Sequence, residues 1–192
     1  MRRFLLMFAA CLIAAVLLTP SAKAGTIVYS TLGPGGSYNC CNSNYTITGA
    51  GSMIGGPYSQ AQPFTASWSS PITQIDLATG WVSGGDSFNI YLLSDNSGSP
   101  GSVITSWLGL PAASSFGSCC ALSTVTGYIS VTLGTTYWLE VQSAANDMWG
   151  TWNDNTSDTA PAYQIWAATT PEPSTLLLLL PGAALLLLRR RR

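Results

Sequence analysis

Apolar and polar residues alternate in several short segments of the chain. The apolar members of these segments are Phe64, Ala66 and Trp68; Ile75 and Leu77; Phe88, Ile90 and Leu92; Ile129, Val131 and Leu133; and Tyr137, Leu139 and Val141. A period of two places every second side chain on the same face of a strand, and an apolar face of this kind is normally buried. Clusters of Gly, Pro, Asn, Asp and Ser, typical of turns, separate the segments at 33–36, 55–57, 84–86 and 95–101, and the polar stretch at 153–161 indicates a further loop. We therefore expect an all-β domain of roughly eight to ten short strands, an antiparallel β-sandwich of the jelly-roll kind.

The first 24 residues replace this alternation with a continuous apolar run. Arg2 and Arg3 precede an apolar stretch at 4–18, and Ala22 and Ala24 place small residues where a signal peptidase cuts. A helix of about 15 residues spans roughly 22 Å, which is shorter than the roughly 30 Å core of a bilayer. We therefore expect residues 1–24 to be a signal peptide, cleaved before Gly25, rather than a permanent anchor.

The carboxyl end carries a second apolar run, at 176–188, followed by a basic stop. About thirteen residues of helix span roughly 20 Å, and Pro181 interrupts the run, so the predicted hydrophobic helix is a weak membrane span. The four arginines at 189–192 favour the cytoplasmic side of the membrane. We expect a domain at 25–168 outside the inner membrane and a sorting or anchor segment at 169–192.

The tail begins with Pro171, Glu172, Pro173, Ser174 and Thr175, which the leucine-rich run and Arg189, Arg190, Arg191 and Arg192 follow. In this order of residues it resembles the PEP-CTERM sorting signal of Gram-negative bacteria. The resemblance implies processing by exosortase, transient anchoring in the inner membrane, and final placement at the cell surface or in an exopolysaccharide matrix or biofilm. A plain membrane anchor is the alternative.

Five segments follow one another along the domain: VYSTLGPGGSY at 28–38, PITQIDLATG at 71–80, FNIYLLSDNSGSPG at 88–101, FGSCCAL at 116–122 and LGTTYWLEV at 133–141. In their order the domain resembles the choice-of-anchor domains, type R. The resemblance implies a β domain attached to a surface, and it implies no catalytic site.

Charge separates the ends from the domain and excludes several functions. All seven basic residues lie at the two ends, whereas seven of the eight acids lie between Gly25 and Thr170, where there is no Lys, Arg or His. A domain with a net charge of about −7 repels phosphate, so we expect no binding to nucleic acid. Nucleophilic catalysis that depends on His or Lys is excluded for this domain. We expect a non-enzymatic protein; the less favoured alternative is a carboxylate-based glycan hydrolase that uses Glu140 with Asp147, Asp154 or Asp158.

Four cysteines form two adjacent pairs within the domain. They are Cys40, Cys41, Cys119 and Cys120, whereas Cys11 lies in the predicted signal peptide. Cysteines of an exported domain usually form disulfides, and neighbours in sequence pair with difficulty, so we expect two bridges between the pairs, in either connectivity. A zinc site would need a different ligand spacing.

Two sets of residues are candidates for ligand binding, and no cofactor is required by the sequence. Asp95, Asn96 and Ser97 form an oxygen-rich loop that suits Ca²⁺, although the same residues also make a good turn without metal, and Asp147, Asp154 and Asp158 form a second acidic region. Trp149, Trp152 and Trp166 lie near amides and carboxylates, an arrangement that can hold sugar rings. Trp149 and Trp152 are therefore candidates for contact with exopolysaccharide, and packing in the core is the alternative.

The mass of the native protein tests these expectations about the ends and the cysteines. We predict loss of residues 1–24, a cut near Pro171–Ser174, and a gain of about four hydrogens on reduction, because each disulfide takes up two. Intact-mass spectrometry of fractionated cells, with and without reductant, measures all three. An uncut chain in the inner membrane would contradict the sorting interpretation.

Overall fold

The computed structural model describes residues 25–169, except for the side chains of residues 41–44. The predicted signal peptide and the predicted sorting segment from 170 onward lie outside this range. The described residues contain twelve strands: β1 (Gly25–Ser30), β2 (Asn39–Thr48), β3 (Gln60–Thr65), β4 (Ile72–Leu77), β5 (Thr79–Ser83), β6 (Ser87–Asp95), β7 (Pro100–Pro111), β8 (Ser114–Ser115), β9 (Ser123–Ile129), β10 (Thr136–Ser143), β11 (Trp149–Asp154) and β12 (Tyr163–Ala168). One short 3₁₀ turn, η1 (Pro34–Gly36), is present. Within residues 25–169 no helix is both long and apolar enough to cross a membrane.

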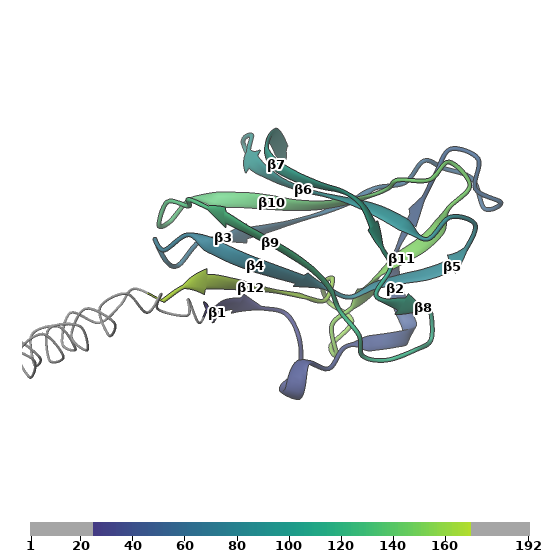
Figure 1. The fold of residues 1–192 in the computed structure, drawn as a ribbon, viewed down its shortest axis with the longest axis horizontal. Helices are drawn as coiled ribbons and strands as arrows, with labels where there is room; N and C mark the ends of the chain where they lie inside the picture. The colour runs from purple at the N-terminus through teal and green to yellow at the C-terminus, as the bar shows by residue number, and fades with distance from the viewer. Residues whose placement is uncertain (1–24, 170–192) are drawn as a thin grey trace, which may run out of the picture.

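The strands form three four-stranded sheets arranged in two layers (Figure 1). Sheet A has the order β1-β12-β4-β9, sheet B the order β2-β11-β5-β8, and sheet C the order β3-β10-β6-β7. Each strand of sheet A is next in sequence to a strand of sheet B, and sheet B holds these sequence neighbours in the same order. For example, β4 and β5 are separated by Ala78 alone. The backbone of Ala78 bonds to Asn153 and Ala162, so the ladder continues across this junction. Sheets A and B therefore form one long layer that faces sheet C, and the predicted all-β sandwich is confirmed.

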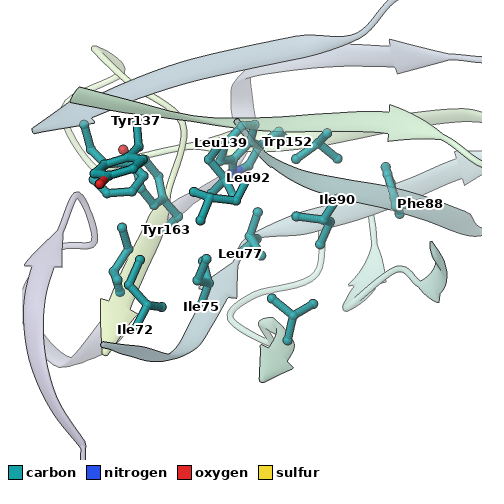
Figure 2. Close-up of a cluster of buried hydrophobic side chains, with 14 of the residues drawn as sticks. Ile72, Ile75, Leu77, Phe88, Ile90, Leu92, Tyr137, Leu139, Trp152 and Tyr163 are labelled. Atoms are coloured by element: carbon teal, nitrogen blue, oxygen red, sulfur yellow. The ribbon is translucent and has the colours of Figure 1, made fainter. Parts of the chain in front are cut away.

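The core lies between the two layers and is built from the alternating positions of the strands. Figure 2 shows Ile75 and Leu77 of β4 facing Leu92 of β6 and Leu139 of β10. All four side chains are fully buried. Because burial of one such side chain contributes roughly 1.5–3 kcal/mol, this shared cluster stabilises both layers together.

Three details of the predicted strands are wrong. Leu133 was expected on an apolar strand face but is 62% exposed, because β9 ends at Ile129 and a turn follows it. Pro100 and Gly101 were expected within a turn but begin the twelve-residue strand β7. Asn153 was expected in a loop but is buried in β11. In each case the pairing of strands, rather than the local residue type, decides the outcome.

A disulfide joins the two edges of sheet B. Cys40 of β2 is bonded to Cys119, which follows β8, across 79 residues of sequence. The backbone N–H of Gly117 also donates to the carbonyl of Cys40, at 3.1 Å. The expected link between the two cysteine pairs is therefore present. A second bridge with this connectivity would join Cys41 to Cys120. Cys120 is exposed with a free thiol, and the side chain of Cys41 lies outside the described residues, so the second bridge stays a prediction.

Both ends of the domain emerge at one corner. Gly25 is paired with Ala168 because β1 and β12 run antiparallel, and Figure 1 shows the two strands ending at the same side of the domain. The loops at 49–59 and 144–148 lie beyond β11 and β2, away from this corner. A tether attached after Thr169 would therefore hold the domain by one end.

Removal of the bridge tests its contribution to stability. We predict that the double substitution Cys40→Ala and Cys119→Ala lowers the free energy of unfolding by about 2–4 kcal/mol, because the unfolded chain regains freedom across a long loop. Urea denaturation of oxidised protein measures the change. The neighbouring exposed Ser118→Ala is the control and should change stability by less than about 0.5 kcal/mol. Equal stability of the double variant and the control would contradict the prediction.

Candidate functional site

The outer face of sheet A carries two rows of side chains that run across its four strands. Alternation turns Ile75, Val125 and Ile165 into the core, so their neighbours in sequence point outward. The strand register aligns these outward residues as Ile27, Trp166, Gln74 and Thr126 in one row, and Ser30, Gln164, Asp76 and Thr124 in the next. Polar side chains on an exposed face are ordinary, but this group is organised around one carboxylate.

Asp76 is the centre of this group and is only 3% exposed, although it lies on the outer face. Its Oδ1 accepts hydrogen bonds from Gln74 Nε2 at 2.8 Å and from Thr124 Oγ1 at 2.6 Å. Its Oδ2 accepts from Gln164 Nε2 at 2.8 Å and from Trp166 Nε1 at 2.6 Å. Four side chains from three strands therefore donate to one carboxyl group.

These four bonds replace the cation that a buried carboxylate would otherwise need. A carboxylate offers about four lone-pair positions, and burial without partners is expensive. Hydrogen bonds to an ionised acceptor are roughly twice as strong as neutral ones. Because every oxygen already accepts two bonds, Asp76 is occupied as an organiser of its neighbours and is poorly placed to act as a general base or a metal ligand.

The carboxylate also sets the orientation of Trp166. Trp166 lies opposite Gln74 in the register, and Asp76 is two residues further along β4. The indole N–H must therefore reach diagonally across the sheet to bond Asp76, so the ring lies along the surface rather than projecting from it. Since the N–H is bonded, the partly exposed ring offers a π face to a ligand. We call this surface the Trp166 platform; it comprises Trp166, Gln74, Gln164, Thr124 and Thr126.

The chemistry of the Trp166 platform suits a neutral, flat, hydroxylated ligand. The amide nitrogens of Gln74 and Gln164 donate to Asp76, which leaves their Oε1 atoms as oriented acceptors. Thr126 adds an exposed hydroxyl beside them. An aromatic face combined with fixed amide and hydroxyl groups can stack on the C–H face of a sugar ring and accept its hydroxyl hydrogens.

Trp152 does not take part in such a surface. It is 0% exposed, and its Nε1 donates to the carbonyl of Ala162 at 3.0 Å. A side chain with no exposed area cannot stack on a ligand, so Trp152 is a core residue. Trp149 is partly exposed on β11, opposite Thr48 and Ser83 in sheet B. The structure therefore separates both residues from Trp166, with which the sequence grouped them.

The loop at 95–99 closes on itself as a turn between β6 and β7. Asn96 and Ser99 exchange backbone hydrogen bonds, and the Asp95 carboxylate accepts the N–H of Gly98 at 3.2 Å. Asp95 also accepts the indole N–H of Trp138 at 2.8 Å. The bond from Trp138, followed by that from Gly98, lowers the pKa of Asp95. The turn is thus complete without an ion, and the calcium interpretation of Asp95, Asn96 and Ser97 stays an alternative.

The carboxylates considered for catalysis lie on separate elements. Glu140 accepts Gln142 Nε2 on the outer face of sheet C, and Asp158 accepts Asn39 Nδ2 in the loop after β11. Asp147 accepts the backbone N–H of Gly85, and Asp154 is buried in β11. Among the described residues, no three His, Cys, Asp or Glu side chains are grouped closely enough to hold a metal ion.

An open groove of about 380 Å³ lies at the end of the domain away from its termini. Residues 48–50, 57–59 and 142–146 line it, and none of them is charged. Tyr58, which is 53% exposed, is its one aromatic lining residue. The groove is a second neutral surface, but its polar groups are not organised around a buried charge as those of the Trp166 platform are.

Substitution of Asp76 tests its organising role. We predict that Asp76→Asn lowers the free energy of unfolding by about 2–3 kcal/mol, because the new amide nitrogen would face donors that have lost their acceptor. Denaturant titration measures the loss. The exposed Asp86→Asn, whose side chain has no such set of donors, is the matched control and should stay within about 0.5 kcal/mol of the wild type. A stable Asp76→Asn protein with unchanged Trp fluorescence would show that the four bonds do not orient Trp166.

Comparisons of the chain with protein-family models, with curated proteins and with solved structures gave no match. The Trp166 platform is therefore identified as a candidate site from the geometry of its own residues.

Proposed function

We propose that this protein is an exported, non-enzymatic surface or matrix component whose β-sandwich contacts neutral polysaccharide through the Trp166 platform. The observation that carries the proposal is the bond from Trp166 Nε1 to Asp76 Oδ2, at 2.6 Å. It holds an indole along the sheet surface between oriented amides. A binding surface that is already ordered before the ligand arrives loses less conformational entropy on binding.

The charge of the domain supports a neutral polymer over an acidic one. Residues 25–169 contain seven carboxylates and no basic side chain. A polyuronate or a phosphorylated polymer would meet repulsion and find no Arg or Lys partner. Neutral sugars need an aromatic face and hydrogen-bonding groups, which the platform offers.

The expected location of the protein outside the cell fits a role in contact with polysaccharide. We propose that signal peptidase removes residues 1–24 and that exosortase acts at 171–175, after transient anchoring through 176–192. The domain would then reach the outer surface or the exopolysaccharide matrix of a Gram-negative cell. The shared corner of Gly25 and Ala168 supports this, because both segments that are expected to be processed join the domain there. The disulfide is typical of proteins outside the cytoplasm.

The strand order supports the finer expectation of a jelly roll. If β1/β2, β4/β5 and β11/β12 are each counted as one strand, and the two-residue β8 is left aside, the described residues have eight strands. In chain order, one layer then holds the first, eighth, third and sixth strands, and the other the second, seventh, fourth and fifth. Two Greek keys of this kind form a jelly roll, an architecture common among lectin domains. We infer the jelly-roll fold from this strand order, whereas the proposed ligand is inferred from the residues of the Trp166 platform.

Binding by the full-length chain in mild detergent tests the proposed function. We expect retention by soluble β-1,3-glucan, β-1,4-glucan or β-mannan in affinity electrophoresis, and none by alginate. Trp166→Ala should weaken binding at least tenfold, about 1.4 kcal/mol, because the stacking surface is lost. Trp166→Phe keeps a ring without the N–H and should fall between the two.

Tyr58→Ala is the matched control, because Tyr58 is the exposed aromatic residue of the groove. It should bind as the wild type does. Loss of binding in Tyr58→Ala, with full binding in Trp166→Ala, would move the site to the groove. Preference for alginate would contradict the proposed ligand class.

A further inference from the structure

The outer face of sheet C repeats the arrangement of tryptophan and aspartate that is found on sheet A. Trp138 of β10 lies opposite Leu93 of β6, and Asp95 is two residues further along β6. Trp138 Nε1 donates to Asp95 Oδ1 at 2.8 Å. In both sheets, then, an outward indole reaches diagonally to a carboxylate on the adjacent antiparallel strand.

The burial of Leu93 shows how the second indole lies. Leu93 is outside the hydrophobic core cluster, and its neighbour Leu92 points inward, so Leu93 faces outward. It is nevertheless only 5% exposed. Its strand neighbours are Trp138 of β10 and Val103 of β7, and Val103 is itself 56% exposed. The indole of Trp138 is therefore the side chain placed to cover Leu93, with one ring face outward.

Partly exposed polar and aromatic side chains continue from Trp138 along the same face in one direction. Glu140 lies opposite Tyr91, and its Oε1 accepts Gln142 Nε2 at 2.8 Å. That bond leaves the Oε1 atom of Gln142 as an oriented acceptor, as for Gln74 and Gln164 on sheet A. We call this surface the Trp138 platform; it comprises Trp138, Tyr91, Glu140 and Gln142.

The two platforms face in opposite directions. The core cluster that contains Ile75, Leu77, Leu92 and Leu139 lies between sheets A and C, so their outer faces point away from each other. Packed sheets are separated by about 10 Å, and side chains and edge strands fill the space around them. One short oligosaccharide cannot cover both faces at once.

We propose that the domain is bivalent: the Trp138 platform binds a second neutral glycan chain, on the face opposite the Trp166 platform. The proposal rests on the proposed function, since the same ligand class is assigned to both faces. Asp95 and Glu140 give the second face two acids and no cation, which favours a neutral glycan here also. One copy of the protein would then hold two polysaccharide chains together without forming a dimer.

The stoichiometry of binding tests bivalence separately from binding itself. We expect isothermal titration of the full-length chain in detergent with β-1,3-glucan, β-1,4-glucan or β-mannan hexasaccharides to give two sites per chain. Trp138→Ala and Trp166→Ala should each leave one site, and the double variant should leave none. Trp149→Ala, a partly exposed tryptophan in neither platform, is the matched control and should keep both sites.

A second variant guards against misfolding of Trp138→Ala. Asp95→Ala removes the acceptor at an exposed turn and frees the indole, so it should weaken the second site several-fold and leave the first unchanged. Near-ultraviolet circular dichroism checks that each variant keeps its fold.

The possible outcomes separate the two proposals. No binding to any of the three glycans would overturn the proposed function and bivalence together. A single site that Trp166→Ala removes and Trp138→Ala spares would overturn bivalence alone. A chain that pairs with a second copy through the Trp138 face, detected as a dimer that Trp138→Ala dissociates, would also overturn bivalence.

Discussion

The absence of any cation between Gly25 and Thr169 constrains how every acid of the domain is satisfied. A carboxylate that leaves water must gain hydrogen bonds or a counter-ion, and here N–H and O–H groups are all that the chain supplies. Asp76 consequently accepts hydrogen bonds from two glutamine amides, a threonine hydroxyl and an indole N–H. Asp95 accepts them from an indole N–H and from a backbone N–H of its own turn. The same bonds that satisfy the charge also order the side chains around it. In this domain, the satisfaction of buried charge and the ordering of outer-face side chains come from one set of contacts.

The layer architecture determines where those surfaces lie. Sheets A and B form one long layer, and sheet C covers sheet A through a shared apolar core. Alternation along each strand then leaves outward residues on two opposite faces. The Cys40–Cys119 bridge closes sheet B by joining its edge strands, which would otherwise be open to pairing with another chain. Both ends of the domain lie at one corner of sheet A, so a tether there would hold the domain by the edge near which Trp166 lies.

Four tryptophans of this domain take three different roles, which the burial of the ring together with the partner of its N–H distinguishes. Trp152 donates to a backbone carbonyl in the core, and Trp107 donates to the carbonyl of Thr126, so it ties β7 to β9 at the edge of the sandwich. Trp166 and Trp138 donate to carboxylates on outer faces. An indole in the core contributes apolar burial, whereas one bonded along a surface keeps a ring face for a partner. Trp166 and Trp138, which belong to this last class, are the tryptophans proposed to contact sugar rings.

The sequence by itself determined the all-β class, the core faces of most strands, the acidic and cation-free domain, and the link between the two cysteine pairs. These are properties of local alternation, composition and count, which need no knowledge of neighbours. The spacing of Gln74 with Asp76 and of Gln164 with Trp166 was also visible, since each pair lies two residues apart and so shares a strand face. Only the tertiary structure decided that β12 pairs with β4, that Trp152 is buried, and that Asp76 sits beneath four donors. The physical reason is that strand pairing joins residues about 90 positions apart, and alternation predicts which face a side chain takes but not which strand lies beside it.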